Sequence, residues 1–281
     1  MFFWQIVLMK KITLLSLCLF LLLQACESKI STLEKRGIEF HSINQFHSAG
    51  NVGDKLLTLD SLNAIGWMLK ASKLSHVFSD LTFKEAHQAI DKAIAIKPDF
   101  TEAYMVKARI FRLMWDSVKL KDAIEDALQL ESENTKNLNL AGESYNAIEM
   151  YPEAVAIYGH LIKLDSNTFE NWANRGLNHM LNGDLNRAEV DLLKSRKISK
   201  KTDGRNRNKA NVYLTLAMLY EEKGMYEQIP VSMDTAIRIW KKITANDSAS
   251  SSVLYSLNMR RADWNRKLGR NHEALIDLNK A

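Results

Sequence analysis

The residue types that most often carry enzyme chemistry are sparse in this 281-residue chain and do not form known arrangements. The sequence has no His-Glu-x-x-His, no Gly-x-Ser-x-Gly and no phosphate-binding glycine loop. His87 and His160 are isolated in amphipathic segments, and His179 stands where a large packing residue is expected. Three acidic residues form a pattern typical of a solvated helix face: Asp122, Glu125 and Asp126. We therefore predict a non-enzymatic chain without a metal or cofactor.

Cysteine chemistry is confined to the N-terminal region, because the two cysteines are Cys18 and Cys26. Lys10 and Lys11 precede an apolar run over residues 12–23, and Leu-Gln-Ala-Cys ends that run. A basic segment followed by an apolar segment and a small residue is typical of a secretory signal. The run of about 12 residues is too short to span a bilayer as a helix.

The Leu-Gln-Ala-Cys sequence resembles the lipobox of bacterial lipoproteins. The resemblance implies that residues 1–25 are a signal peptide and that Cys26 carries the acyl chains of a membrane anchor. Glu27 stands where inner-membrane retention usually has Asp, which favours the outer membrane. Residues 26–59 are expected to form a lipid-anchored polar tether. A signal cleaved elsewhere and an uncleaved N-terminal anchor are the alternatives.

Charge and composition narrow the classes of fold and partner. The formal net charge is +5, and it falls by two when Lys10 and Lys11 leave with the signal. A balance this small predicts no nucleic-acid partner. The chain has 3 prolines and no sustained apolar/polar alternation, so long helices are expected rather than strands.

A spacing of 34 residues recurs along the chain and indicates an array of repeated helix pairs. Ala108, Gly142 and Gly176 follow this spacing, each within an amphipathic helical pattern. The position where two helices cross must be small, since a larger side chain would push the helix axes apart. Small residues occupy that position in six predicted pairs: Ala71, Ala108, Gly142, Gly176, Ala217 and Ala262.

This pattern resembles the tetratricopeptide repeat family over residues 60–281. The resemblance implies an all-α, right-handed α-α superhelix (a tetratricopeptide solenoid) of about six helix pairs. Gly183, Gly224 and Gly269 each lie seven residues after a small site, where a left-handed helix end is expected. A capping box is predicted to begin a helix at Thr82. The sixth pair is the least regular, because Asn258 and Asn265 stand where large residues are expected.

In that family the first helix of each pair lines a concave face, so the resemblance also implies a binding groove. The predicted groove residues are Met105, Arg109, Arg112, Asn139, Glu143, Asn146 and Asn174. The same register adds Glu102, Lys136, Glu170, Met180, Asn211, Thr215, Met218 and Glu221. Asn side chains both donate and accept hydrogen bonds, and two arginines favour a partner that carries carboxylates. The alternative contact surface is a basic insertion with Lys200, Lys201, Arg205, Arg207 and Lys209.

These observations predict a non-catalytic scaffold or adaptor lipoprotein of the bacterial envelope. Its partner would be a protein, as a peptide or helix in the groove, and its lipid would contact the membrane. A rival from another class is a ligand-capture lipoprotein of the outer membrane that binds a nutrient such as a glycan. The rival needs a cluster of exposed tryptophans outside the packing frame. Trp67 and Trp172 fall inside that frame, whereas Trp115, Trp240 and Trp264 are unassigned.

Overall fold

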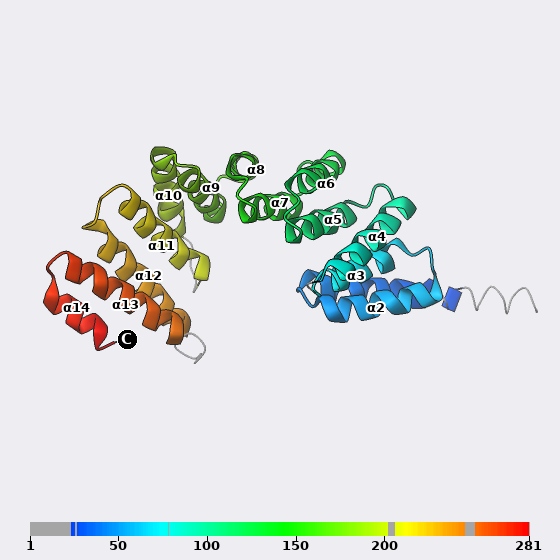
Figure 1. The fold of residues 1–281 in the computed structure, drawn as a ribbon, viewed down its shortest axis with the longest axis horizontal. Helices are drawn as coiled ribbons and strands as arrows, with labels where there is room; N and C mark the ends of the chain where they lie inside the picture. Colours follow the sequence, from blue (N-terminus) through cyan, green and yellow to red (C-terminus); the bar gives the residue numbers. More distant parts are fainter. Residues whose placement is uncertain (1–23, 26, 78, 202–205, 245–250, 281) are drawn as a thin grey trace, which may run out of the picture. The chain divides into compact units, whose positions relative to one another are not determined.

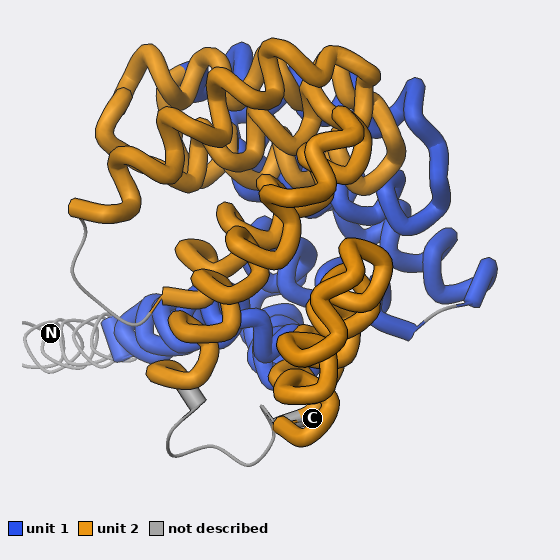
Figure 2. Tube along the Cα trace, turned by 90° about the vertical axis from the view of Figure 1, so that its left-hand side faces the viewer, with its two compact units in different colours: residues 1–132 blue, residues 133–281 orange. Residues whose placement is uncertain are grey.

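The computed structural model describes residues 24–25, 27–77, 79–201, 206–244 and 251–280. Every regular element in these ranges is a helix, so the all-α expectation is confirmed for the described residues. The predicted signal peptide and Cys26 lie outside them. The chain divides into two compact units, unit 1 over residues 1–132 and unit 2 over residues 133–281 (Figure 2).

Each unit is a stack of helices in which each helix packs against the next one along the chain (Figure 1). Unit 1 contains a helix over residues 27–42, then α2 (Phe46–Leu59), α3 (Ala64–Leu74), α4 (Asp80–Ile96), α5 (Thr101–Leu113) and α6 (Ser117–Leu130). Unit 2 contains α7 (Thr135–Ala147), α8 (Tyr151–Leu164), α9 (Phe169–Leu181), α10 (Leu185–Ser199), α11 (Arg207–Glu222), α12 (Gln228–Thr244), α13 (Ser251–Lys267) and α14 (Asn271–Leu278). The six predicted pairs correspond to α3–α4 through α13–α14.

The tether expected over residues 26–59 is wrong for the described part of that range, because residues 27–42 and α2 form a further helix pair. Gly37 lies 34 residues before Ala71 and occupies the small crossing position of this pair. A Cβ added at Gly37 would overlap Leu69 and would lie 3.3 Å from Val52 Cγ1. Leu56 of α2 is fully buried, so this pair contributes side chains to the core and does not act as a polar tether.

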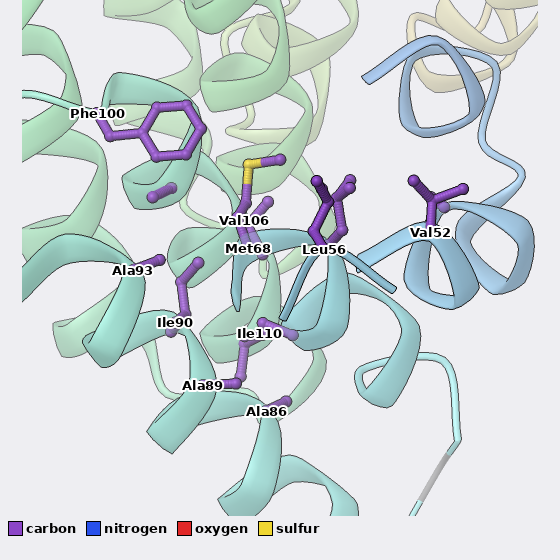
Figure 3. Packing of buried hydrophobic residues seen from close by; sticks show 14 residues of the cluster. Val52, Leu56, Met68, Ala86, Ala89, Ile90, Ala93, Phe100, Val106 and Ile110 are labelled. Atoms are coloured by element: carbon purple, nitrogen blue, oxygen red, sulfur yellow. The ribbon is translucent and has the colours of Figure 1, made fainter. Parts of the chain in front are cut away.

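Buried aliphatic side chains and small residues form the core of unit 1 (Figure 3). Leu56 from α2 and Met68 from α3 pack with Ile90 from α4 and Ile110 from α5. Unit 2 has an equivalent cluster in which Leu192 packs with Leu216 and Met233. Burying one such side chain contributes about 1.5–3 kcal/mol relative to leaving it exposed. Residues at helical spacing therefore hold each pair to the next, as the sequence predicts.

Short polar side chains fix where many of the helices begin. Asn63 accepts from the backbone N–H of Gly66 at 2.8 Å and caps α3. The capping box of α4 starts at Ser79 rather than at Thr82, because Ser79 is the N-cap and Thr82 is its third residue. In three pairs, a glycine follows the first helix at the same register position and has a left-handed backbone conformation. The φ angles are +84° at Gly183, +70° at Gly224 and +75° at Gly269. These three predicted helix ends are confirmed.

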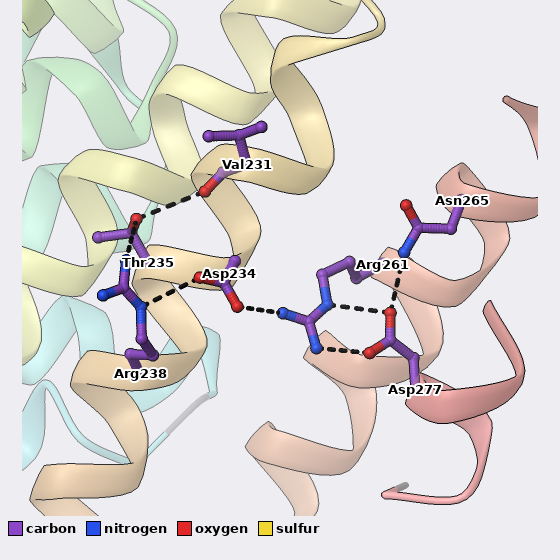
Figure 4. A network of polar contacts seen from close by, with 7 residues as sticks. All are labelled: Val231, Asp234, Thr235, Arg238, Arg261, Asn265 and Asp277. Atoms are coloured by element: carbon purple, nitrogen blue, oxygen red, sulfur yellow. Dashed lines mark hydrogen bonds and ion pairs between the residues drawn. The ribbon is translucent and has the colours of Figure 1, made fainter. Parts of the chain in front are cut away.

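The least regular predicted pair, α13–α14, is held by a buried polar network (Figure 4). Arg261 donates from Nε to Asp277 Oδ2 at 3.0 Å and from Nη2 to Asp277 Oδ1 at 2.5 Å. Asn265 Nδ2 donates to the same carboxylate at 3.1 Å, and Arg261 Nη1 donates to Asp234 of α12 at 2.7 Å. Asn265 replaces a large apolar residue here because its partner is a buried carboxylate.

Candidate functional site: the concave groove of unit 2

The first helices of three successive pairs, α7, α9 and α11, line a groove of about 600 Å³ in unit 2. Its walls combine amide, carboxylate and apolar side chains. The lining residues are Asn139, Glu143, Phe169, Glu170, Ala173, Asn174, Leu177, Asn208, Asn211, Val212, Leu214, Thr215 and Met218. Three of the seven predicted groove residues therefore lie together here, namely Asn139, Glu143 and Asn174.

The amides of the groove keep hydrogen-bonding capacity for a ligand. Asn139 donates from Nδ2 to the carbonyl of Thr135, 2.7 Å away in its own helix, which leaves its Oδ1 as an acceptor. Thr215 donates to the carbonyl of Asn211 at 3.0 Å, and Asn211 itself is exposed. Extended backbone presents alternating donors and acceptors, which such amides match in either direction.

Tyr158 of α8 lies beneath this surface and is almost fully buried. Burial raises the pKa of its hydroxyl, the nearby Glu143 carboxylate raises it further, and a hydrogen bond with Asn174 lowers it. The hydroxyl is therefore neutral at physiological pH. Gly142 makes room for the Tyr158 ring, since a Cβ added there would lie 2.7 Å from Tyr158 Cζ. This close approach accounts for glycine at the crossing position of α7.

The electrostatic character of the groove is acidic. None of the lining residues is Lys, Arg or His, whereas Glu143 and Glu170 are among them. Glu170 accepts a long hydrogen bond of 3.4 Å from Asn206. The groove thus differs from the expectation of one surface that carries arginines beside asparagines.

Asn146 is a predicted groove residue that takes part in packing instead. Its Nδ2 donates to Asn178 Oδ1 at 2.9 Å, and Asn178 Nδ2 donates to the carbonyl of Asn174 at 2.8 Å. The first bond ties α7 to α9, and the second lies within α9 and ends on the backbone of the groove residue Asn174. Sequence reasoning placed Asn146 on the correct helix but could not identify its partner in the next repeat.

The three remaining predicted groove residues belong to α5 of unit 1. Met105 is only 3% exposed, so it is a core residue and its assignment to a binding surface is wrong. The Arg109 guanidinium lies 4.3 Å from the centre of the Phe46 ring. Burial, and then repulsion from Arg112, lower the pKa of Arg109 to about 10. Phe46 belongs to α2, within the range predicted to be a tether, so the sequence pattern does not indicate this contact.

The basic insertion, the alternative surface, is only partly described. Lys200 and Lys201 follow α10, and Arg207 and Lys209 lie at the start of α11, while Arg205 is outside the described residues. Arg207 lies 5.6 Å from the centre of the Trp240 ring. No group of His, Cys, Asp and Glu among the described residues is arranged to hold a metal ion. No described helix has the length and apolar character needed to cross a membrane.

Comparison with known proteins gives matches in structure alone. No protein family and no curated protein matches the sequence. The structure is similar to BtubC from P. vanneervenii, with a TM-score of 0.56, 15% identity, and coverage of 71% of this chain and 87% of that one. It is also similar to a chain of the APC/C hetero-tetramer Cut9-Hcn1, with a TM-score of 0.54 and 15% identity. That match covers 89% of this chain but only 44% of the other, less than half its length.

A third similar structure is YrrB, described as a TPR protein with an unusual peptide-binding site. The TM-score is 0.48 at 21% identity, over 66% of this chain and 91% of YrrB. The fold is the tetratricopeptide repeat fold. Seven helix pairs of this tetratricopeptide array are present in the described residues, one more than the sequence predicted. The additional pair is the one formed by residues 27–42 and α2.

Proposed function

We propose that this tetratricopeptide chain is a non-catalytic scaffold that binds an extended, basic segment of a partner protein in the groove of unit 2. The observation that carries the proposal is the composition of that groove. Amides from α7 and α11 face a cleft whose only charged lining groups are Glu143 and Glu170. Amides satisfy the backbone of an extended segment, and carboxylates form charge-assisted hydrogen bonds with Lys or Arg.

The proposal revises the chemistry of the expected partner. The arginines that favoured a carboxylate-bearing segment are not among the groove's lining residues. Apolar residues of the lining, among them Leu177, Val212 and Met218, suit aliphatic side chains on the same segment. Met contacts adapt to different shapes, which fits a surface that recognises backbone and charge more than one fixed side chain.

The envelope location is part of the same proposal. The basic, apolar and Leu-Gln-Ala-Cys segments of residues 10–26 support a lipid anchor on Cys26 and, with Glu27, the outer membrane. Because residues 27–42 are already helical, the folded part would begin next to the anchor rather than after a tether. Replacing Cys26 with Ser and fractionating the cells tests this location. Unchanged acylation and membrane recovery of the variant would reject it.

The rival ligand-capture function finds less support among the described residues. Trp240 and Trp264 are each 9% exposed, and Trp115 alone among the described tryptophans is largely exposed, at 68%. Trp172 donates from Nε1 to the carbonyl of Ser166 at 2.9 Å, as Trp67 does to Ser61. A platform for sugar stacking needs several exposed rings together, and one isolated ring does not supply it.

Sorting a displayed library of random peptides against the purified protein tests the groove. We expect recovered peptides to be enriched in Lys and Arg and to lack enrichment in Asp and Glu. The double variant Glu143→Gln, Glu170→Gln should lose the enrichment. A matched double variant, Glu133→Gln with Glu222→Gln, removes two exposed carboxylates of unit 2 outside the groove and should retain it. Equal enrichment in all three proteins would overturn the proposal.

A further inference from the structure

A basic residue directly precedes the small crossing residue in three of the first helices. These residues are Lys107 of α5, Arg175 of α9 and Arg261 of α13. Lys107 donates from Nζ to Asp91 of the preceding helix, α4, at 2.8 Å. Arg261 donates from Nη1 to Asp234 of the preceding helix, α12, at 2.7 Å (Figure 4). In both places, a carboxylate from the pair before is the partner of the cation.

Arg175 is the exception, because Gly159 of α8 stands at the position that holds the carboxylate elsewhere. Gly159 lies 16 residues before Arg175, just as Asp91 lies 16 residues before Lys107. Gly159 and Asp234 also share a register position, since each lies ten residues after the left-handed residue that follows the first helix of its pair. A Cβ added at Gly159 would lie 3.7 Å from Arg175 Nη1, so a side chain at this position would reach that nitrogen.

The Arg175 guanidinium is held in place with one nitrogen left for a ligand. Its Nε and Nη2 donate to the two carboxylate oxygens of Asp191 at 2.7 and 2.8 Å, and its central carbon lies 5.0 Å from the centre of the Trp172 ring. Nη1 has no hydrogen-bond partner among the described residues. The side chain is 23% exposed, and Nη1 retains solvent access.

An open cavity of about 530 Å³, lined by α8, α9 and α10, gives a ligand access to Arg175. Arg187 also lines it, with a side chain that is 75% exposed, and adds a second positive charge. Val155 and Val190 supply apolar walls. Among the described residues that line the cavity, Asp191 alone is acidic, and its two oxygens are already paired with Arg175. The surroundings of Nη1 therefore favour an anion with a short apolar stem.

We propose that Arg175 Nη1 binds the side-chain carboxylate of an Asp or Glu of a partner protein in this cavity. The partner supplies from outside the carboxylate that Asp234 supplies to Arg261 within the chain. Arg187 is positioned to add a charge-assisted hydrogen bond. The inference rests on the proposed scaffold function but concerns a second, acidic segment, because no residue that lines this cavity lines the groove.

Nuclear magnetic resonance of the full folded chain tests the site, because an Nε–H held against a carboxylate, as in Arg175, gives an observable signal. The probe is N-acetylaspartate N-methylamide. Its neutral isostere, N-acetylasparagine N-methylamide, and sodium chloride at matched ionic strength are the controls. We expect the aspartate probe alone to shift the Arg175 Nε–H signal saturably. Burial lowers the pKa of His179 at the cavity and Asp191 raises it, so a further bound anion should raise that pKa again.

The variant Gly159→Asp places the missing carboxylate within the chain. We expect it to move the Arg175 Nε–H signal in the same direction as the bound probe and to abolish the response to added probe. Gly159→Ala is the matched control, since its Cβ makes an ordinary contact and leaves Nη1 free, so it should keep the full response. Arg175 is unchanged in both variants, because its removal would leave the buried Asp191 carboxylate without its bidentate partner.

Three results would overturn the site. The first is the absence of a saturable response to the aspartate probe, and the second is an equal response to the asparagine probe or to chloride. The third is an equal response to the aspartate probe in Gly159→Asp and Gly159→Ala. Peptide enrichment in the groove depends on Glu143 and Glu170, which lie outside this cavity, so either proposal can fail while the other stands.

Discussion

Unit 1 and unit 2 place different side chains at the same register positions. Arg109 and Glu143 are 34 residues apart, and each directly follows the small crossing residue of its helix. Arg109 lies against Phe46, and its buried Nε and Nη2 atoms have no hydrogen-bond partner among the described residues, whereas Glu143 lines an open groove. Trp115 and Glu149 are likewise equivalent, and both adopt positive φ where later pairs have glycine.

The difference shows which positions the repeat fold constrains. Crossing positions must be small and core positions must be apolar, because the helices otherwise cannot pack. The position after the crossing residue carries no such requirement, so it can hold a cation in one unit and an anion in the other. The binding chemistry of this molecule therefore depends on individual residues and their neighbours. The repeat register determines only which positions those residues occupy.

The sharpest contrast between the units is the effect of removing an arginine. Arg261→Met in unit 2 leaves the Asp277 carboxylate, 3% exposed, with Asn265 as its remaining side-chain partner. Breaking a buried ion pair from one side costs about 3–5 kcal/mol of unfolding free energy. Arg109→Met in unit 1 removes a charge that has no ion-pair partner among the described residues and should cost nothing measurable.

Urea denaturation of the two variants measures this contrast. Amide hydrogen exchange in α13 and α14 locates the loss, because a repeat array opens in parts rather than all at once. Similar losses in both variants would mean that Arg109 has an internal role, and the distinction between the units would disappear. A loss for Arg261→Met alone would support it.

Packing beneath the groove gives a smaller effect. Gly142→Ala places a Cβ 2.7 Å from the Tyr158 ring, where unit 1 has Ala108 opposite the smaller Ile124. Overpacking costs about 1–3 kcal/mol, and the better helix propensity of alanine offsets up to about 1 kcal/mol of it. We expect a net loss of about 1–2 kcal/mol in denaturation, with altered peptide binding because the Tyr158 hydroxyl moves relative to Asn174.

Gly159→Ala on the adjacent helix is the matched control. The nearest atom to a Cβ added there is Arg175 Nη1 at 3.7 Å, an ordinary contact. Only the propensity gain remains, so this variant should be more stable by up to about 1 kcal/mol. If both alanine variants gain stability, the Tyr158 ring yields easily and does not set the shape of the groove.

The sequence predicts the packing frame better than the chemistry on it. The 34-residue register located the helix pairs and brought Asn139, Glu143 and Asn174 to one groove. The register does not indicate the first pair, because Gly50 and Gly53 are typical of the end of a helix. In the structure both lie inside α2, and a Cβ added at Gly53 would lie 2.8 Å from the carbonyl oxygen of Gly66. These glycines bring α2 close to α3, which only the partner helix reveals.

Contacts between distant residues account for the other errors. The Arg109 guanidinium lies over the ring of Phe46, a residue 63 positions earlier in the range predicted to be a tether. The register predicts Met105 on the concave face, but the residue is only 3% exposed. Register gives the direction of a side chain from its own helix and says nothing of what covers it.

The turn between the helices of a pair provides the smallest test of the comparison. Trp115 follows α5 with φ of +56° and is 68% exposed, while Gly183 occupies the equivalent position after α9 in unit 2 with φ of +84°. A left-handed conformation costs a residue with a side chain roughly 1–2 kcal/mol and costs glycine little. The exposed indole of Trp115 recovers little of this cost by burial.

Trp115→Gly should therefore raise the unfolding free energy of unit 1, and Gly183→Ala should lower that of unit 2, each by about 1 kcal/mol. Glycine adds freedom to the unfolded chain, which reduces the gain at Trp115 below the full cost of the strain. Differential scanning calorimetry of the two variants beside the unchanged chain measures both shifts. A destabilised Trp115→Gly variant would show that the indole contributes contacts worth more than the strain of its backbone. The turns at Trp115 and at Gly183 would then be kept for different reasons, by side-chain packing at Trp115 and by backbone freedom at Gly183.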